Sequence, residues 1–471
     1  MSSMSFRCLP RVVSRPLVAA ALAAAAVAFP AAVSANAAPI TCGDIAGLKT
    51  AIMAGGTIDL TPYCVYVLTA ADSGVDGLPA VTNNTVINGN HATIQRDPAL
   101  TSATPFRILR IASGGNLTVS DLTVMNGLLT GFEFGGGILV QSGGALTATS
   151  NLTIQGNRVL RQGGGLRVEG SGAAELTASL IKDNTANSIS GGLGGGIDSS
   201  GNLKLHGTVV SSNRAGEYGG GIYKNGVGRL GIDQNSVITN NRATGAGADD
   251  GGGGGILAFG GGSITDSVVT NNTVTNGQGG GGIIADSGML TVTRSIISGN
   301  TLAYNITLPT LPATGAGILA DGNTSNVVLD GSTVTGNKIV GARGRGAGLA
   351  ATRGTITLQN TSGVTTVSNN LASGSYSQGG GLYTASGTTL NAIGAVITGN
   401  KATGTGSQGG GIFNNGGSLS LDGATSVTSN TAATAPGGIW TSVPFATTAT
   451  VTGNIPTNCA ASPATVTGCT G

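Results

Sequence analysis

Short runs of alternating apolar and polar residues recur along most of the chain. Segments 203–205, 290–292, 356–358 and 419–421 place an aliphatic residue at every second position. Alternation with period two is typical of a β-strand that buries one face. Residues after 55 show no long apolar stripe of helical period. The pattern therefore predicts an all-β protein made of many short strands.

Two marks recur around these strands. One is an aliphatic residue directly behind a glycine, which we call the start mark. It occurs at Ile138, Leu166, Ile197, Ile222, Ile256, Ile283, Ile318, Leu349, Leu382, Ile412 and Ile439. The other is an asparagine with Ile or Val three positions earlier, which we call the register asparagine. It occurs at Asn157, Asn184, Asn213, Asn241, Asn272, Asn300, Asn337, Asn370, Asn400, Asn430 and Asn454.

The regular spacing of the start marks indicates a solenoid. The ten intervals between Ile138 and Ile439 span 301 residues, a mean of about 30. A unit of this size with short strands cannot bury its inner face alone, whereas stacked copies can. Each coil advances by about 4.8 Å, so eleven coils make a rod of roughly 50 Å. We expect glycine at one corner of each coil, and asparagine at another with its amide bonded to the coils above and below.

The N-terminal part predicts a cap and the first coils. Asp44 is a suitable N-cap for a helix over 44–53, which would bury Ile45, Leu48, Ile52 and Met53 on one face. The first strands are expected at 57–60, 65–69, 85–94, 106–111 and 116–124. The expected organisation is a signal peptide (1–37), cap helix and first coils (38–127), repeat coils (128–456) and a C-terminal cysteine loop (457–471).

Residues 1–37 are ordered like a secretory signal. Arg7, Arg11 and Arg15 precede an apolar run at 17–29 and a small-residue cleavage motif at 35–37. We expect cleavage, export to the extracellular space or the cell surface, and no transmembrane segment in the mature chain. An uncleaved anchor is the alternative.

Four cysteines remain after cleavage of the signal. They form two local pairs, and an even number in an exported chain favours disulfides. We predict the bridges Cys42–Cys64 and Cys459–Cys469, with free thiols as the alternative.

Charge is sparse and nearly balanced. The chain has 22 Lys and Arg against 20 Asp and Glu, and loss of the three signal arginines leaves 19 against 20. No basic stripe is present in the sequence, so a nucleic-acid partner is not expected. The local cluster Arg343, Arg345 and Arg353 is interpreted as solvated charges.

The two marks carry a family resemblance. The Gly-Gly-Gly-Ile and Val-x-x-Asn repeats resemble those of the polymorphic outer membrane proteins, and residues 40–456 resemble the pectin lyase-like superfamily more broadly. The resemblance implies a right-handed parallel β-helix with about 30 residues per coil. Its members include lyases, hydrolases and adhesins, so it implies no single function.

Residues typical of the superfamily's enzymes are missing from the sequence. His91 and His206 do not lie in a Gly-His-Gly segment, and no Arg-Ile-Lys segment occurs. The pair Asp249-Asp250 is interpreted as a solvated turn, with catalysis or metal binding as the alternative. Asp198 nearly completes a calcium-binding repeat, but the motif is not tandem. We therefore predict no catalytic, cofactor or metal residues and leave Ca²⁺ open as an alternative.

One outward row suggests a ligand contact. The residues after the last three start marks are Tyr383, Phe413 and Trp440, which should lie about 4.8 Å apart per coil. Such a row could stack on sugar rings or pack under a loop. The expected protein is a monomeric, non-enzymatic β-helix of the cell surface or matrix that contacts polysaccharide or another surface component. A polysaccharide lyase or glycoside hydrolase is the alternative, and it would require acids converging on one outward face near the longest returns between coils.

Overall fold

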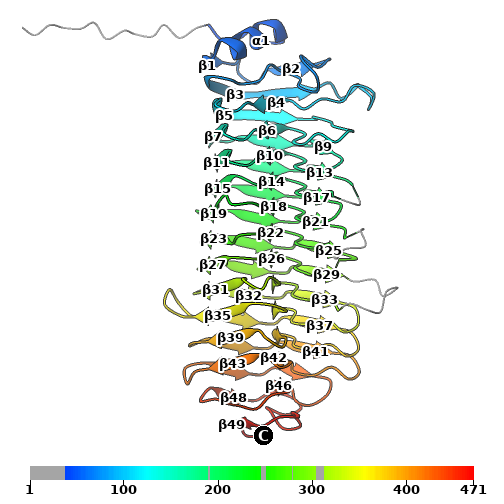
Figure 1. Ribbon diagram of the computed structural model, residues 1–471, viewed down its shortest axis with the longest axis vertical. Coiled ribbons are helices and arrows are strands. Elements are labelled where there is room, and N and C mark those ends of the chain that lie inside the picture. The colour runs from blue at the N-terminus through cyan, green and yellow to red at the C-terminus, as the bar shows by residue number, and fades with distance from the viewer. Residues whose placement is uncertain (1–37, 189–190, 246–250, 278, 304–311) are drawn as a thin grey trace, which may run out of the picture. The chain divides into compact units, whose positions relative to one another are not determined.

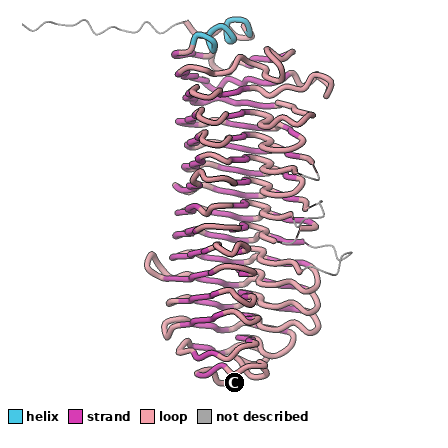
Figure 2. The backbone as a smooth tube through the Cα atoms, in the orientation of Figure 1, coloured by secondary structure: helices cyan, strands magenta, loops and turns pink. Residues whose placement is uncertain are grey.

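The computed structural model describes residues 38–188, 191–245, 251–277, 279–303 and 312–471. These residues belong to one unit, Ala38–Gly471. The unit is a right-handed parallel β-helix whose coils stack along one axis, with its C-terminus at one end (Figures 1 and 2). The signal segment 1–37 lies outside the described residues and stays a prediction, as does the proposed division into parts.

Each coil contributes strands to three parallel sheets, in which a strand pairs with its counterparts in the coils before and after. The 12-stranded start sheet contains the start marks and comprises β4 (Leu109–Ile111), β6 (Ile138–Val140), β10 (Leu166–Val168), β14 (Ile197–Ser199), β18 (Ile222–Lys224), β22 (Ile256–Ala258), β26 (Ile283–Ala285), β30 (Ile318–Ala320), β34 (Leu349–Ala351), β38 (Leu382–Thr384), β42 (Ile412–Asn414) and β46 (Ile439–Thr441).

The 25-stranded wide sheet receives two strands from most coils, because the chain bends within it. It comprises β1 (Gly56–Asp59), β2 (Val65–Leu68), β3 (Asn84–Arg96), β5 (Asn116–Met125), β7 (Ala145–Ser150), β8 (Thr153–Gln155), β11 (Ala173–Thr177), β12 (Leu180–Lys182), β15 (Asn202–His206), β16 (Val209–Ser211), β19 (Leu230–Asp233), β20 (Val237–Thr239), β23 (Gly262–Thr265), β24 (Val268–Thr270), β27 (Met289–Thr293), β28 (Ile296–Ser298), β31 (Asn326–Asp330), β32 (Thr333–Thr335), β35 (Thr355–Gln359), β36 (Thr366–Ser368), β39 (Thr389–Ala392), β40 (Val396–Thr398), β43 (Ser418–Leu421), β44 (Ser426–Thr428) and β48 (Thr450–Thr452).

The 10-stranded narrow sheet follows the register asparagines. It comprises β9 (Arg158–Val159), β13 (Thr185–Ala186), β17 (Arg214–Ala215), β21 (Arg242–Ala243), β25 (Thr273–Thr275), β29 (Thr301–Ala303), β33 (Lys338–Val340), β37 (Leu371–Ser373), β41 (Lys401–Thr403) and β45 (Thr431–Ala432). At the C-terminal end β47 (Phe445–Ala446) pairs with β49 (Val466–Thr467).

The predicted cap helix is confirmed as α1 (Ile45–Ala54), where the Asp44 carboxylate accepts a hydrogen bond from the Gly47 N–H at 2.8 Å. Leu48 and Ile52 are buried against the first coils, as expected. The expected burial of Met53 is wrong, because its side chain is 57% exposed near the helix end. The strand β4 also shows that the start sheet begins one coil earlier than the start marks do.

Buried amide side chains connect the coils at the register asparagines. Asn272 donates from Nδ2 to Asn300 Oδ1 at 3.0 Å and to the Ile238 carbonyl oxygen at 2.9 Å. Its Oδ1 accepts from both the backbone N–H and the Nδ2 of Asn241 at 3.0 Å. The same Nδ2-to-Oδ1 bond links each neighbouring pair of the eleven register asparagines. We call this chain of bonds the asparagine ladder, and it confirms the predicted amide stacking.

The glycine of the start mark is a steric consequence of the ladder. A Cβ on Gly255 would lie 2.7 Å from the Gly282 carbonyl oxygen and 2.9 Å from Asn272 Nδ2. Both distances are too short for a side chain, so glycine is required where the start sheet passes over the amides. The glycine before each start mark therefore packs against a register asparagine, so a single packing requirement accounts for both repeated features.

Residues outside the ladder bond to each of its ends. Asn157 Oδ1 accepts from the Gly127 N–H at 2.9 Å, and Asn454 Nδ2 donates to Asn458 Oδ1 at 3.0 Å. Asn458 precedes the loop closed by the disulfide Cys459–Cys469, and Cys42–Cys64 ties the segment before α1 to the first coils. Both predicted disulfides are confirmed.

Removing one member of the ladder should destabilise the protein. In Asn272→Ala the buried N–H and amide of Asn241 lose their acceptor, and the Ile238 carbonyl loses a donor. We predict a loss of about 2–4 kcal/mol in the free energy of unfolding, because stranded buried groups cost about 1–3 kcal/mol each. Urea denaturation followed by circular dichroism would measure this.

The neighbouring residue supplies a matched control. Asn271 is exposed and has φ 55°, so Asn271→Gly keeps the left-handed backbone and breaks no ladder bond. We expect a change below about 0.5 kcal/mol. Equal losses in the two variants would contradict the role of the ladder.

Candidate functional site

A groove of about 380 Å³ opens on the outer face of the start sheet, in the coils from β18 to β34. Its lining combines aromatic, aliphatic and charged side chains. The lining residues are Tyr218, Tyr223, Leu257, Phe259, Gly279, Ile284, Asp286, Pro312, Thr314, Leu319, Asp321, Arg345 and Thr352.

The groove is hollow because one row of its wall contains two glycines. Equivalent positions in successive coils carry Tyr218, Gly252, Gly279, Thr314 and Arg345, which pair from coil to coil. The two central glycines leave a gap between the large neighbours. Aliphatic side chains at the base of the groove occupy part of that gap. For example, a Cβ on Gly279 would lie only 2.3 Å from Leu319 Cδ2. The residue four positions before each start mark therefore controls the shape of the groove.

Aromatic rings stand at one end of the groove. Tyr223 and Phe259 meet edge to face, with ring centroids 6.0 Å apart. Both rings pack partly exposed against the buried Leu257. Burial and the charge of Asp198 raise the pKa of the Tyr223 phenol, so it remains a neutral hydrogen-bonding group at neutral pH.

Two carboxylates continue the row of Phe259 in the next two coils. Asp286 and Asp321 occupy the same position in consecutive coils, and both are half-buried. Asp321 Oδ1 accepts a hydrogen bond from the Thr352 hydroxyl. Burial, and then the charge of Asp321, raise the pKa of Asp286, whereas Arg353 opposes the shift. The groove thus meets the condition of converging acids that the enzyme alternative sets.

Arg345 closes the far end of the groove. Its guanidinium lies 5.0 Å from the centre of the Tyr383 ring, and its Nε donates to Gln378 Oε1 at 3.0 Å. Arg345 is half-buried, which corrects its interpretation as a solvated charge. Both contacts hold the cation against the next coil, beyond the lining of the groove.

The predicted aromatic row is assembled but largely covered. Tyr383 and Phe413 have ring centroids 6.0 Å apart, and Phe413 and Trp440 stack at 3.9 Å. Tyr383 is 1% and Phe413 2% exposed, and only Trp440 keeps partial exposure. This burial fits the alternative in which the row packs beneath neighbouring chain. A ligand contact at Trp440 stays a prediction.

Asp198 lies in the same outward row and is completely buried. It forms an ion pair with Arg167, yet its Oδ2 has no hydrogen-bond partner within the described part of the chain. Burial raises the pKa of Asp198 to about 7, opposed by Arg167 and by Lys224. Burial also lowers the pKa of Lys224 to about 8. The near-match to a calcium repeat therefore marks a buried ion pair.

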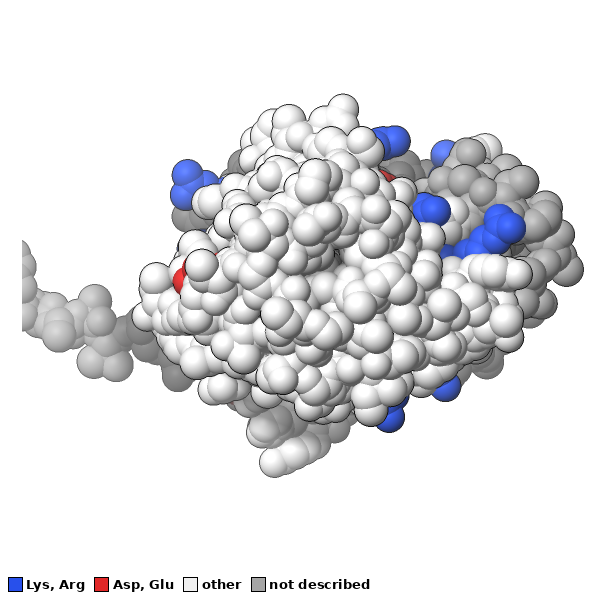
Figure 3. Space-filling view, turned by 90° about the horizontal axis from the view of Figure 1, so that it is seen from below, with Lys and Arg blue, Asp and Glu red and all other residues white. Residues whose placement is uncertain are grey.

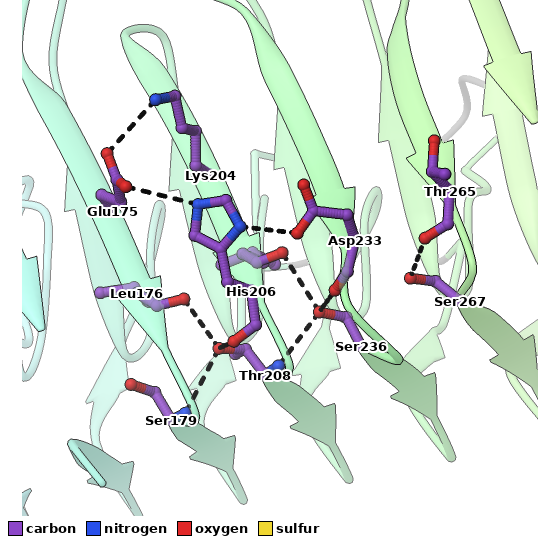
Figure 4. Close-up of polar contacts among 11 residues, drawn as sticks. Glu175, Leu176, Ser179, Lys204, His206, Thr208, Asp233, Ser236, Thr265 and Ser267 are labelled. Carbon is purple, nitrogen blue, oxygen red and sulfur yellow. Dashed lines mark hydrogen bonds and ion pairs between the residues drawn. The ribbon is translucent and has the colours of Figure 1, made fainter. Parts of the chain in front are cut away.

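His206 bridges two carboxylates on the wide sheet, as Figure 4 shows. Its Nδ1 lies 2.6 Å from Asp233 Oδ1, and its Nε2 lies 3.4 Å from Glu175 Oε1. Behind it the Thr208 backbone N–H donates to Ser236 Oγ at 3.0 Å, part of a buried hydroxyl ladder that the sequence analysis missed. Because its two ring nitrogens face carboxylates of the preceding and the following coil, His206 connects three consecutive coils.

Two further candidates from the sequence remain, His91 and the pair Asp249 and Asp250. His91 stacks on Tyr63 with ring centroids 5.1 Å apart. Asp249 and Asp250 lie outside the described residues. The described residues contain no group of three or more His, Cys, Asp or Glu side chains placed to hold a metal ion. Within the same residues, no helix is long and apolar enough to cross a membrane.

The stacked coils and the outer groove define a right-handed parallel β-helix with a surface site. The chain matches the family model described as "Right handed beta helix region" over residues 63–292 and 221–432, and it belongs to that family. A search of curated proteins and a search of solved structures found no match. The finer likeness to pectin lyase-like and polymorphic outer membrane proteins stays a prediction.

The buried ion pair predicts a pH-dependent stability. The pKa of Asp198 is about 7 in the folded state, above its ordinary 3.8, so the folded state binds this proton more tightly. The stabilising contribution is full below pH 3.8 and is lost as the pH rises toward 7. We expect Asp198→Asn to remove this loss, so that the variant gains on the wild type by up to about 1.4 kcal/mol per pH unit in that window.

Denaturation at pH 4, 5.5 and 7 would measure the difference between the two proteins. Asp183→Asn, at an exposed acid, is the control and should follow the wild type. A wild-type-minus-variant difference that does not change with pH would contradict the prediction.

Proposed function

We propose that this protein is exported and acts at the cell surface or in the extracellular matrix as a monomeric, non-enzymatic β-helix that binds a polysaccharide. The groove on the start sheet supports the proposal most directly, because one hollow joins aromatic rings, an aliphatic floor and carboxylates. Two disulfides, and the lack of a membrane-spanning helix in the described residues, are compatible with an extracellular location.

The chemistry of the groove suits sugar rings. A sugar presents C–H faces that pack on aromatic and aliphatic groups, and hydroxyl edges that donate hydrogen bonds to carboxylates. Tyr223 and Phe259 supply the first kind of contact, and Asp286 and Asp321 the second. Two carboxylates repel an acidic sugar, so a neutral or amino sugar fits this groove best.

The carboxylate pair supports a second candidate, a glycoside hydrolase. Such enzymes use two carboxyl groups, one of which keeps its proton and acts as the general acid. Asp286 has the raised pKa that this role needs, and Asp321 lies beside it in the next coil. No cofactor is required in this scheme, and Ca²⁺ binding in the groove remains an untested alternative.

Filling the groove should weaken binding. The described atom closest to a Cβ at Gly279 is the end of the flexible Leu319 side chain, so Gly279→Phe should fold and place its ring in the hollow. We expect binding of β-glucan or chitin oligosaccharides, measured by calorimetry, to weaken by about tenfold or more, because the ring displaces the contact surface.

A second outward glycine gives the matched control. A Cβ on Gly231, in β19 of the wide sheet, would meet nothing closer than 3.9 Å, so Gly231→Phe should bind like the wild type. Equal weakening in both variants, or no binding by the wild type, would overturn the groove proposal. Release of reducing ends by the wild type, lost in Asp286→Asn, would replace it with the hydrolase.

A further inference from the structure

The narrow sheet carries a row of basic side chains that the linear sequence does not show as a cluster. The residue after each of the first ten register asparagines points outward, and these ten residues pair in one register from coil to coil. In chain order they are Arg158, Thr185, Arg214, Arg242, Thr273, Thr301, Lys338, Leu371, Lys401 and Thr431. Half of the positions are cationic and none is acidic. We call Arg158, Arg214, Arg242, Lys338 and Lys401 the basic row.

The cations of this row are available for a partner. All five are exposed, and none forms an ion pair with another described residue. The row crosses eight coil steps, which at about 4.8 Å each makes a line of roughly 38 Å. Without the predicted signal segment the chain has 19 basic and 20 acidic residues, so this line is a local excess of positive charge on a nearly neutral molecule.

A hollow lies beside the N-terminal end of the row. It has a volume of about 270 Å³, and Arg158 and Arg214 border it on either side of Thr185. Leu128 and Leu160 provide an apolar lining. The hollow can seat one unit of a polymer while two guanidinium groups, two coils apart, contact its anionic substituents.

The C-terminal end of the rod has a different surface. Figure 3 looks onto this end and shows it almost free of charged side chains, with Lys and Arg at its margins. Residues 402–471 contain a single charged side chain, Asp422. Long-range attraction of an anion therefore acts on the sides of the rod and not on this end.

We propose that the basic row binds a linear acidic polysaccharide, one whose sugar rings carry carboxylates, along the axis of the rod. A line of cations one residue wide matches a single extended polyanion that carries one acid per ring. This site is separate from the groove on the start sheet and does not depend on the function proposed for it.

Other anionic partners fit the row less well. Single-stranded nucleic acids bind where aromatic rings stack on the bases, and the outward residues two positions further along the narrow sheet include no aromatic. A membrane surface is two-dimensional and favours a broad basic face with apolar anchors. The basic row is a single line of cations and does not form such a face.

Binding of polygalacturonate to the mature protein, measured across salt concentrations, tests the proposal. We expect binding that weakens as salt rises, and a further loss of about tenfold in Arg214→Gln/Arg242→Gln, because each exposed charge contact contributes modestly. Arg229→Gln, at an exposed arginine off the row, and the groove variant Gly279→Phe should bind like the wild type. Because the row residues are exposed, the double variant should keep the wild-type unfolding midpoint.

Two results would overturn the proposal. One is unchanged polygalacturonate binding in the double variant, or an equal loss in Arg229→Gln. The other is tighter binding, at the same salt, to single-stranded DNA or to vesicles containing phosphatidylserine than to polygalacturonate. A loss of binding in Gly279→Phe with none in the double variant would assign the acidic glycan to the groove instead.

Discussion

The amide-to-amide hydrogen bond between register asparagines is the interaction on which the rest of the structure depends. Each buried asparagine satisfies its own donors and acceptors only when the next coil places an identical side chain above it. A slip of one residue would leave several buried polar groups unpaired, at a cost of about 1–3 kcal/mol each. The ladder therefore sets the register of the coils that carry a register asparagine, and the glycine of the start mark follows from the space that the amides occupy.

A fixed register converts residues about 30 positions apart into neighbours on the surface. The groove exists because Gly252 and Gly279 fall in one wall row, and the basic row exists because arginine and lysine recur after the register asparagine. Neither feature is local in sequence. Both proposed binding sites are rows of side chains from successive coils, and such rows can be identified only after the register is known.

The sequence was sufficient for the coils and the amide stacking, which the repeat specifies, and for both disulfides and the cap helix, which local motifs specify. It failed where an outcome depends on what covers a residue. Tyr383 and Phe413 point outward by alternation, yet neighbouring chain buries them, and Met53 lies on the apolar helix face but beyond the reach of the first coil. The groove was not predicted because it arises where side chains are missing. The basic row was not predicted because its residues are far apart in the sequence. Applying the repeat to the position after each asparagine would have revealed that row.

The division between inner and outer rows explains why the fold does not determine the function. Stability of a solenoid is close to a sum of contributions from each coil and each contact between neighbouring coils, and the ladder and aliphatic core supply those contacts. An outward residue such as Arg214 contributes little to them, so its replacement alters the surface without altering the register. Faces of opposite character can then exist on one rod: carboxylates in the groove of the start sheet, cations along the narrow sheet. Because the two faces share a scaffold but no side chains, the proposed ligands would bind independently unless one polymer is long enough to reach both faces.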